Sequence, residues 1–184
     1  MSPPSFIVLA RHADDIPADW RDRLAQRLGQ RPRRLGTWTE LALYGALRCA
    51  DASAAPPDAA TRLRVTSTRA TATATRQALT QACEGFPLPF TFMQSQTSHM
   101  LAALAAHLTW TGDASFIAAG GVEQTFAHCC AEAAGSPLLF GVVEEGDPLV
   151  SQWVWLAPAQ PGADTHAHSF AHALTGPSPL APTR

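Results

Sequence analysis

The sequence contains no lysine, so all 13 of its Lys-plus-Arg residues are arginine. Every arginine except Arg184 lies within residues 1–76, whereas the acidic residues are spread over both halves of the chain. This asymmetry predicts an oriented surface, which either receives an acidic partner or pairs its arginines with the chain's own carboxylates. With a net charge of −2 and no motif that mixes basic and aromatic residues, nucleic acid is not an expected partner.

Cysteine is scarce, and no apolar run is long. The four cysteines form no CxxC pair, which excludes the usual zinc motifs and a disulfide framework; they are Cys49, Cys83, Cys129 and Cys130. No apolar run approaches the ~20 residues that a membrane span needs, and Arg11 interrupts the apolar start, unlike a signal peptide. We therefore expect a cytoplasmic protein without a membrane span.

No cofactor or metal site is expected. Gly120-Gly121 lacks the third glycine of a dinucleotide-binding fingerprint. His166, His168 and His172 could be read as a metal cluster, but they lie in a terminal segment flanked by proline, so no zinc site is expected there.

Alternating apolar and polar patterns predict an α/β fold in which helices cover a layered, mainly parallel sheet. Thr37 and Glu40 have the spacing of a capping box at the start of the second helix. We expect one domain over residues 1–160 and a flexible tail over 161–184, where proline, glycine and small residues dominate. The elements expected outside the central stretch are strands at Phe6–Ala10, Leu63–Ser67, Leu138–Val143 and Ser151–Ala157, and helices at Ile16–Leu28, Trp38–Cys49, Thr68–Cys83 and Thr125–Ala134.

The stretch from Phe90 to Glu123 organises the chain. It reads as a buried strand at Phe90–Met93, a polar turn, a mostly buried helix at His99–Thr111 and a second buried strand at Ala114–Ala119. A turn of this kind places its residues at a helix N-terminus, where free backbone N–H groups can activate a cysteine or hold an oxyanion.

The turn itself contains Ser95 and Gln96 and no cysteine. Glutamine is not a nucleophile, and a serine there would need a base, which the neighbouring sequence does not offer. His99, one turn into the helix, can hydrogen-bond to either side chain, although a buried structural histidine fits the pattern as well.

The same stretch resembles the active-site segment of β-ketoacyl synthases, which have the thiolase-like fold. In that family a cysteine opens the buried helix, a Gly-acidic-Ala turn follows, and the next strand ends in Ala-Gly-Gly-x-Glu. The corresponding residues are Gly112-Asp113-Ala114 and Ala119-Gly120-Gly121-Val122-Glu123. Counting back without gaps puts Ser95 at the cysteine position, and a slip of one residue puts Gln96 there. Chain-length factors, the non-condensing partners of ketosynthases, characteristically have glutamine at that place.

A later stretch, Ser136–Leu149, resembles the strand and acidic turn of short ketosynthase-like proteins that occur with aryl polyene and xanthomonadin-type pigment synthesis. The resemblance covers about Arg64 to Ala157 and implies the N-terminal half of a thiolase-like fold. The histidine segments of the second ketosynthase half are not in this sequence.

The resemblance implies a chain-length-factor-like protein without condensing activity. Its partners would be an active ketosynthase and an acyl carrier protein, in polyketide or fatty-acid-like aryl polyene pigment biosynthesis. Ketosynthases pair by joining sheets edge to edge, so we expect a homo- or heterodimer formed through Phe90–Met93 and the following helix. Two alternatives remain: an acyltransferase or malonyl-carrier decarboxylase that uses Ser95 or Gln96 with support from His99, and a module that binds acyl carrier protein through its arginine-rich half.

Overall fold

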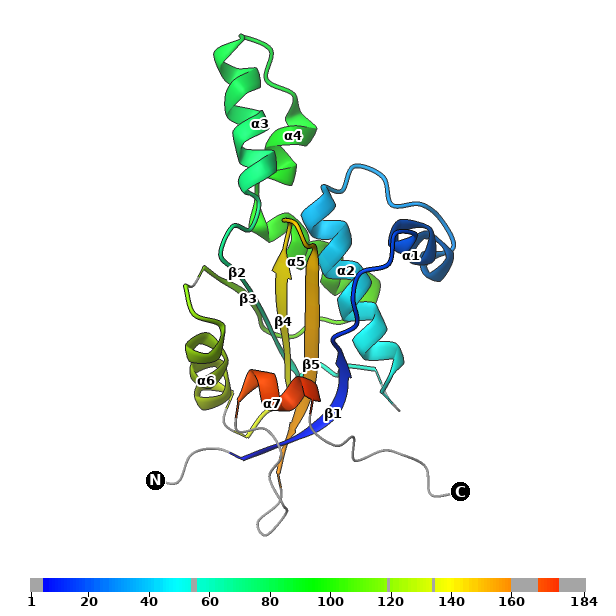
Figure 1. The fold of residues 1–184 in the computed structure, drawn as a ribbon, viewed down its shortest axis with the longest axis vertical. Helices are drawn as coiled ribbons and strands as arrows, with labels where there is room; N and C mark the ends of the chain where they lie inside the picture. The colour runs from blue at the N-terminus through cyan, green and yellow to red at the C-terminus, as the bar shows by residue number, and fades with distance from the viewer. Residues whose placement is uncertain (1–4, 54–55, 119, 134, 160–168, 176–184) are drawn as a thin grey trace.

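A five-stranded sheet with helices on both faces forms the body of the protein, and a helical arm projects from one end of it (Figure 1). The structure is a computed structural model that describes residues 5–53, 56–118, 120–133, 135–159 and 169–175. The strands are β1 (Phe6–His12), β2 (Arg62–Ser67), β3 (Ala114–Ala118), β4 (Leu138–Glu144) and β5 (Val150–Pro158). The helices are α1 (Trp20–Leu28), α2 (Thr37–Asp51), α3 (Ala72–Cys83), α4 (Pro89–Gln94), α5 (Thr97–Leu108), α6 (Val122–Glu132) and α7 (Phe170–Thr175).

The strand order is β1-β5-β4-β2-β3. Strand β2 runs parallel to β3 and β4, whereas β5 runs antiparallel to β4 and β1. The layered α/β fold is confirmed, but the sheet is mixed rather than mainly parallel. Only residues 145–149 separate β4 from β5, too few for the crossover that parallel neighbours need.

Strand β3 lies at one edge of the sheet, and its residues are half-buried or exposed rather than buried as the sequence pattern suggested. Phe116 on this strand packs edge-on against Trp38 of α2, with ring centroids 5.6 Å apart. A short apolar run does not distinguish an edge strand from a central one, which explains the difference.

Each face of the sheet has its own hydrophobic core. One core lies against α1, α2 and α5, and includes Trp20, Leu24, Leu41, Leu104 and Trp153. The other lies against α6 and α7, and includes Phe6, Phe126, Phe140, Leu156 and Phe170. In the described part of the chain, none of the helices has the length and apolar character to span a membrane.

The capping box expected at the start of α2 does not form. Gly36 is the N-cap residue, and no side chain caps the helix. Arg21 of α1 instead donates hydrogen bonds to Glu40 Oε2 at 3.0 Å and to Thr37 Oγ1 at 2.9 Å. Both polar side chains therefore link α1 to α2 rather than closing the helix end.

Residues 169–175 contribute to the core, although the sequence predicted a flexible tail over residues 161–184; the other residues of that range lie outside the described structure. Phe170 and Ala173 of α7 are buried, and the Phe170 ring packs against Phe126 and Phe140. The Glu123 carboxylate of α6 accepts hydrogen bonds from the backbone N–H groups of Phe170 (2.8 Å) and Ala171 (2.9 Å). His166 and His168 lie outside the described residues.

Arg64 of β2 is the one arginine among the largest fully buried side chains of the described residues. Its guanidinium donates to Asp113 Oδ2 at 2.6 Å and to Glu132 Oε1 at 2.8 Å. These hydrogen bonds lower the pKa of both carboxyl groups below their usual values. Arg64 thereby connects the turn before β3 and the end of α6 to strand β2.

Removing the α7 anchor should destabilise the protein. We expect Phe170→Ala to lower the free energy of unfolding by about 3–5 kcal/mol, because it empties a buried aromatic site. A chain ending at Gln160 should also melt at a lower temperature than the full chain. Thermal and urea unfolding followed by circular dichroism measure both, with the exposed Thr175→Ala as the matched control. A Phe170→Ala chain as stable as the parent would contradict the packing described.

The Arg64 cluster, which consists of Arg64, Asp113 and Glu132, should make the free energy of unfolding depend on pH. A carboxyl group with a lowered pKa in the folded state stabilises the fold above its unfolded pKa, and that stability is lost as pH falls through the folded value. At pH 7, Asp113→Asn and Glu132→Gln should each cost up to about 1 kcal/mol, since both carboxylates are well exposed to solvent. The deficit should shrink below about pH 4, where the parent's carboxylates protonate.

Urea unfolding at neutral and acid pH measures that difference, and Glu84→Gln, at the exposed C-cap residue of α3, is the control. A deficit of the same size at both pH values would show that the two carboxylates act by packing and not by charge.

Candidate functional site

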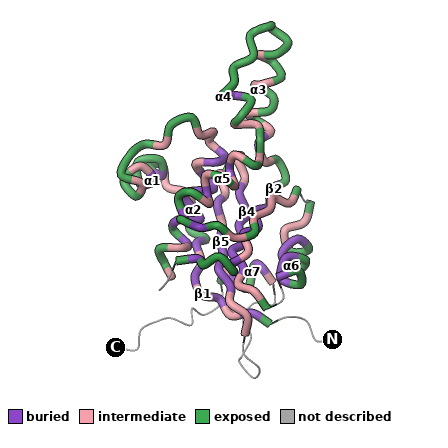
Figure 2. The backbone as a smooth tube through the Cα atoms, turned by 180° about the vertical axis from the view of Figure 1, so that it is seen from behind, coloured by how far each residue is buried: buried purple, intermediate pink, exposed green. Residues whose placement is uncertain are grey.

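The arm formed by α3 and α4 is the most solvent-exposed part of the described chain. The two helices pack on each other and project beyond the end of the sheet (Figure 1). No residue of α3 is buried, and Thr91 is the buried residue of α4. Figure 2 shows the arm as mostly exposed, in contrast to the buried strands below it. The arm therefore has no hydrophobic core of its own.

Large apolar side chains nevertheless cover this arm. In the part of the chain that the structure describes, all six exposed large hydrophobic side chains belong to it, and we call them the apolar arm surface. They are Leu79, Phe86, Leu88, Phe90, Phe92 and Met93, with exposed fractions of 63%, 78%, 55%, 44%, 62% and 44%. Clustered apolar side chains in water mark a binding surface in soluble proteins.

The apolar arm surface corrects the prediction of a buried strand at Phe90–Met93. This segment is part of α4, which begins with Pro89 in its first turn, a position that proline favours. Phe90, Thr91 and Phe92 alternate between apolar and polar residues, as residues of a half-buried strand do. In the structure, however, the threonine is the buried residue of α4. Edge-to-edge pairing through a Phe90–Met93 strand is therefore wrong, whereas the exposure of its side chains makes the same segment available to a partner.

A sharp turn joins the arm to α5, as the sequence predicted, although it joins two helices rather than a strand and a helix. Ser95 is the C-cap residue of α4, and Gln96 is the N-cap residue of α5. Ser95 Oγ donates to the Phe92 carbonyl at 2.7 Å and accepts a hydrogen bond from Gln96 Nε2 at 3.1 Å. Gln96 thus occupies the helix N-terminus, with its amide on the serine hydroxyl.

His99 does not join these two side chains. Its Nδ1 is buried and has no hydrogen-bond partner among the described residues, while its backbone N–H donates to the Gln96 carbonyl at 3.1 Å. Helix α5 buries only Met100, Leu104 and Leu108, so it is half-exposed rather than mostly buried. The structure therefore brings Ser95 and Gln96 together and leaves the His99 imidazole apart from them.

The turn offers little nucleophilic chemistry. Ser95 Oγ donates to a backbone carbonyl, and no described carboxylate or imidazole accepts its proton. The three buried thiols give no alternative, because burial raises the pKa of Cys49 and Cys130 to about 12 and that of Cys129 to about 11. These thiols stay protonated at neutral pH and are not activated for acyl transfer.

The base of the arm is held firmly to the sheet. Thr71 Oγ1, just before α3, donates to the Ser95 carbonyl at 2.8 Å. At the end of β4, the Glu144 carboxylate accepts hydrogen bonds from Ser67 Oγ, Thr68 Oγ1 and the Thr68 N–H. Both ends of the arm are therefore fixed where they leave the body.

A second contact reaches the arm from the loop between α1 and α2. The Arg34 guanidinium lies 4.5 Å from the centre of the Phe90 ring, and Gln94 Nε2 donates to the Arg34 carbonyl at 3.2 Å. Sequence reasoning missed Arg34 and Glu144, because each contact joins segments that are far apart in the chain.

The glycine-rich motifs that carry the family resemblance have structural roles here. A Cβ at Gly112 would lie 2.7 Å from the Ala59 carbonyl oxygen, so this turn requires glycine. The adjacent Asp113 forms an ion pair with Arg64. Gly121 is the N-cap residue of α6, and the Glu123 carboxylate accepts a hydrogen bond from the first residue of α7, Phe170. These residues therefore position β2, β3, α6 and α7 relative to one another.

No protein-family model matches the chain, and no curated protein gives a significant match. Among solved structures, it is similar to a chain in the complex of the ketosynthase ApeO with its chain length factor ApeC from Xenorhabdus doucetiae. The TM-score is 0.59 at 15% sequence identity, over 88% of this chain and 81% of that one.

Two further structures match. One is AntDE:AntF, a type II polyketide synthase acyl-carrier protein in complex with its ketosynthase bound to the hexaketide. It has a TM-score of 0.59 and 10% identity over 86% of this chain and 64% of that one. The other is the ishigamide ketosynthase/chain length factor, with a TM-score of 0.56 and 12% identity over 79% of this chain and 48% of that one.

The chain thus spans less than two thirds of the length of the second and third matched chains, and about half of the third. At these identities the likeness concerns the fold. The thiolase-like fold expected from the family resemblance is confirmed: this chain has the fold of chains in ketosynthase complexes, two of which include a chain length factor.

Proposed function

We propose that this chain is a non-condensing, chain-length-factor-like partner of an active ketosynthase, and that it docks through the apolar arm surface. The observation that carries the proposal is the arm itself, whose six large apolar side chains have no place in either core of the described chain. A ketosynthase is the partner that the shared fold favours, because the matched structures include ketosynthases in complex with chain length factors.

The energetics of the arm favour a bound state. Burying one fully exposed phenylalanine or leucine side chain contributes roughly 1.5–3 kcal/mol. Six side chains that are each about half or more exposed therefore offer several kcal/mol, enough to offset part of the entropy that association costs. Since the base of the arm is already fixed by Thr71 and Glu144, little further ordering is needed on binding.

The chemistry of the turn supports the proposed non-condensing role. Claisen condensation requires a nucleophile that holds the acyl chain and donors that stabilise the enolate. At the N-terminus of α5 this chain has Gln96, with Ser95 directly before it. An amide at that position cannot form an acyl ester, so the turn fits a partner that shapes the acyl site better than one that loads it.

The finer assignment rests on the family resemblance. We assign the chain to polyketide or fatty-acid-like aryl polyene pigment biosynthesis in the cytoplasm, with acyl carrier protein as a further partner of the complex. One matched structure contains a ketosynthase with its acyl-carrier protein, which supports that partner.

The two alternatives have less support. An acyltransferase or decarboxylase that uses Ser95 needs a base, and His99 makes no hydrogen bond to either turn side chain. A module that binds acyl carrier protein through its arginines needs free cations, whereas Arg21, Arg23, Arg27 and Arg31 each pair with a carboxylate of this chain.

A charge on the apolar arm surface should abolish pairing without unfolding the protein. We expect Phe92→Asp to reduce co-purification with a co-expressed full-length ketosynthase from the same organism by at least about tenfold. The reason is that an unpaired carboxylate in a desolvated interface costs several kcal/mol. Phe92 is 62% exposed, so the variant should fold. Size exclusion with mass analysis measures the complex, and circular dichroism checks the fold.

The matched control is Ala127→Asp, which adds the same charge to an exposed position of α6 away from the arm. It should pair as the parent does. Normal pairing of the Phe92→Asp chain, or equal loss with Ala127→Asp, would refute docking through the arm. A parent chain that binds no ketosynthase would refute the proposed function as a whole.

A further inference from the structure

Arg34, in the loop between α1 and α2, lies against the apolar arm surface. Its guanidinium is 4.5 Å from the centre of the Phe90 ring, and its carbonyl accepts a hydrogen bond from Gln94 Nε2 at 3.2 Å. Arg34 is exposed, and Phe90 is 44% exposed. The loop thus places one positive charge directly on a side chain that the proposed partner would cover.

The backbone at Arg34 has a conformation that arginine rarely adopts. Its φ is 68°, in the left-handed region. Such a conformation costs free energy, persists only where surrounding contacts impose it, and is found most often at functional sites. The contacts with Phe90 and Gln94 are those that hold the loop here. The fold therefore sets the position of the guanidinium at the expense of backbone strain.

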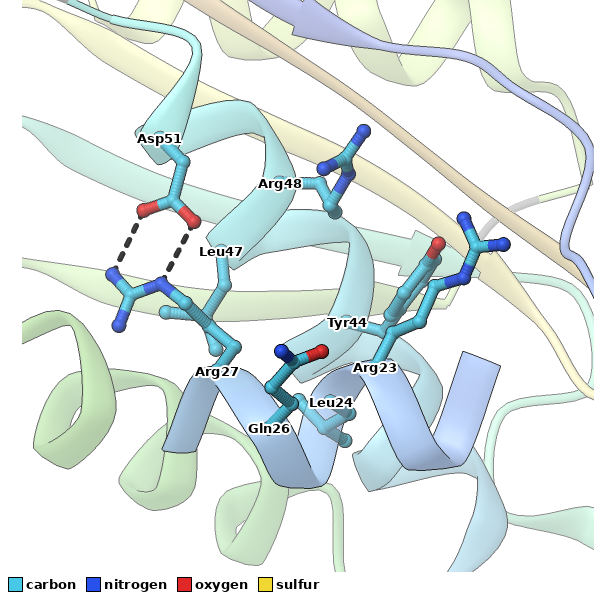
Figure 3. Close-up of a pocket in the computed structure, with 8 residues that line it drawn as sticks. All are labelled: Arg23, Leu24, Gln26, Arg27, Tyr44, Leu47, Arg48 and Asp51. Atoms are coloured by element: carbon cyan, nitrogen blue, oxygen red, sulfur yellow. Dashed lines mark hydrogen bonds and ion pairs between the residues drawn. The ribbon is translucent and has the colours of Figure 1, made fainter. Parts of the chain in front are cut away.

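None of the described carboxylates forms an ion pair with Arg34. Arginines nearby on the body differ in this respect. Figure 3 shows Arg27 of α1 with two hydrogen bonds to the Asp51 carboxylate of α2, at 2.7 and 2.8 Å. In the free protein, water and the face of the Phe90 ring are the surroundings of the Arg34 charge.

A partner that covers Phe90 also covers the Arg34 guanidinium, because the two groups are in contact. Burial removes the water around the charge, and an unpaired guanidinium in an apolar interface is unfavourable unless another polar group replaces that water. A carboxylate is the best replacement, since it can form two parallel hydrogen bonds with a guanidinium. Docking over Phe90 therefore requires an acidic residue on the partner.

A second copy of this chain is a poor source of that carboxylate. Over residues 68–96, which include the arm, the charged residues are Arg69, Arg76 and Glu84. Two arms that faced each other would bring together more positive than negative charge, which opposes association. The complementary surface therefore belongs to a different protein.

We propose that the docking face of the ketosynthase has a carboxylate that pairs with Arg34 beside Phe90, and that this pair makes the docking specific. The inference rests on the proposed function and adds a polar requirement to it. An apolar surface alone accepts many partners, whereas a desolvated charge rejects any face that has no acid at that place.

The affinity of Arg34 variants for the purified full-length ketosynthase from the same organism tests the pair. Arg34→Met removes the charge but keeps a flexible side chain on the Phe90 ring, and it should bind at least about tenfold more weakly than the parent. Arg34→Glu puts a like charge against the carboxylate and should bind at least about tenfold more weakly again. Arg34 is exposed, so both variants should fold, which circular dichroism checks.

The matched controls are Arg33→Met and Arg33→Glu. Arg33 is the exposed neighbour of Arg34 and forms no hydrogen bond or ion pair with any described residue. Both controls should bind as the parent does. Equal effects at the two positions would overturn the proposal, because they would reflect net charge alone.

Two other results would also overturn it. If Arg34→Met binds as tightly as the parent or more tightly, the interface has no carboxylate at this place. If Arg34→Met and Arg34→Glu lose affinity equally, the lost contact with Phe90 explains both.

The same measurements separate this inference from the proposed function. Loss of binding by Phe92→Asp but not by Arg34→Met would leave docking through the arm in place and refute the pair. A parent chain that binds no ketosynthase would refute the proposed function and the pair with it. A parent chain that sediments as a dimer, and that Arg34→Glu makes monomeric, would place the carboxylate on a second copy and refute the ketosynthase as its source.

Discussion

The packing of Trp153 between α2 and the sheet is the contact on which the rest of the structure depends. Trp153 of β5 is fully buried, and two glycines make room for its ring. A Cβ at Gly45 of α2 would lie 2.5 Å from that ring, and one at Gly141 of β4 would lie 2.6 Å from it. Cores packed this closely do not accept additional atoms without strain, so helix and sheet are held at a single distance.

Polar contacts secure the same interface. Trp153 Nε1 donates to Ser151 Oγ, which in turn donates to the Leu41 carbonyl of α2, and Trp38 Nε1 donates to the Val143 carbonyl. Helices α1 and α5 then pack on α2. The position of α2 thus determines where α1 and α5 lie, and with α5 the place of its N-cap residue, Gln96.

The arm is the part of the fold that this arrangement leaves without cover. The two faces of the sheet are occupied by α1, α2 and α5 on one side and by α6 and α7 on the other. Nothing in the described chain packs over Phe86 or Phe92, although hydrogen bonds and Arg34 fix the arm at its base. An apolar segment that is held rigidly in water favours a protein partner over a flexible role.

Sequence reasoning located most of the body because each element has a local signal. The β-branched run of β2 and the apolar run of β4 gave strand boundaries within one residue, and the thiolase-like fold followed from the order of motifs around Gly112 and Gly120. The helix start at Gln96 was also close to its predicted place.

The wrong predictions share one cause. Whether a side chain is buried depends on segments that are distant in the sequence, and a local pattern does not show them. Phe90-Thr91-Phe92-Met93 has the alternation of a strand, and only Pro89 hints at a helix start. Phe170 stands alone among small residues, so its burial against Phe126 has no local pattern. The Arg64 cluster and the Glu123 contact with α7 join positions too distant in sequence to be paired from one chain.

Hydrogen–deuterium exchange of α4, with and without the ketosynthase, tests the central claim most directly. Exchange of backbone amides reports local opening and its loss on burial. If the arm is the docking segment, amides over residues 86–96 should become protected in the complex, while those of α6 should exchange at an unchanged rate. A complex that forms with no change over residues 86–96 would contradict the account.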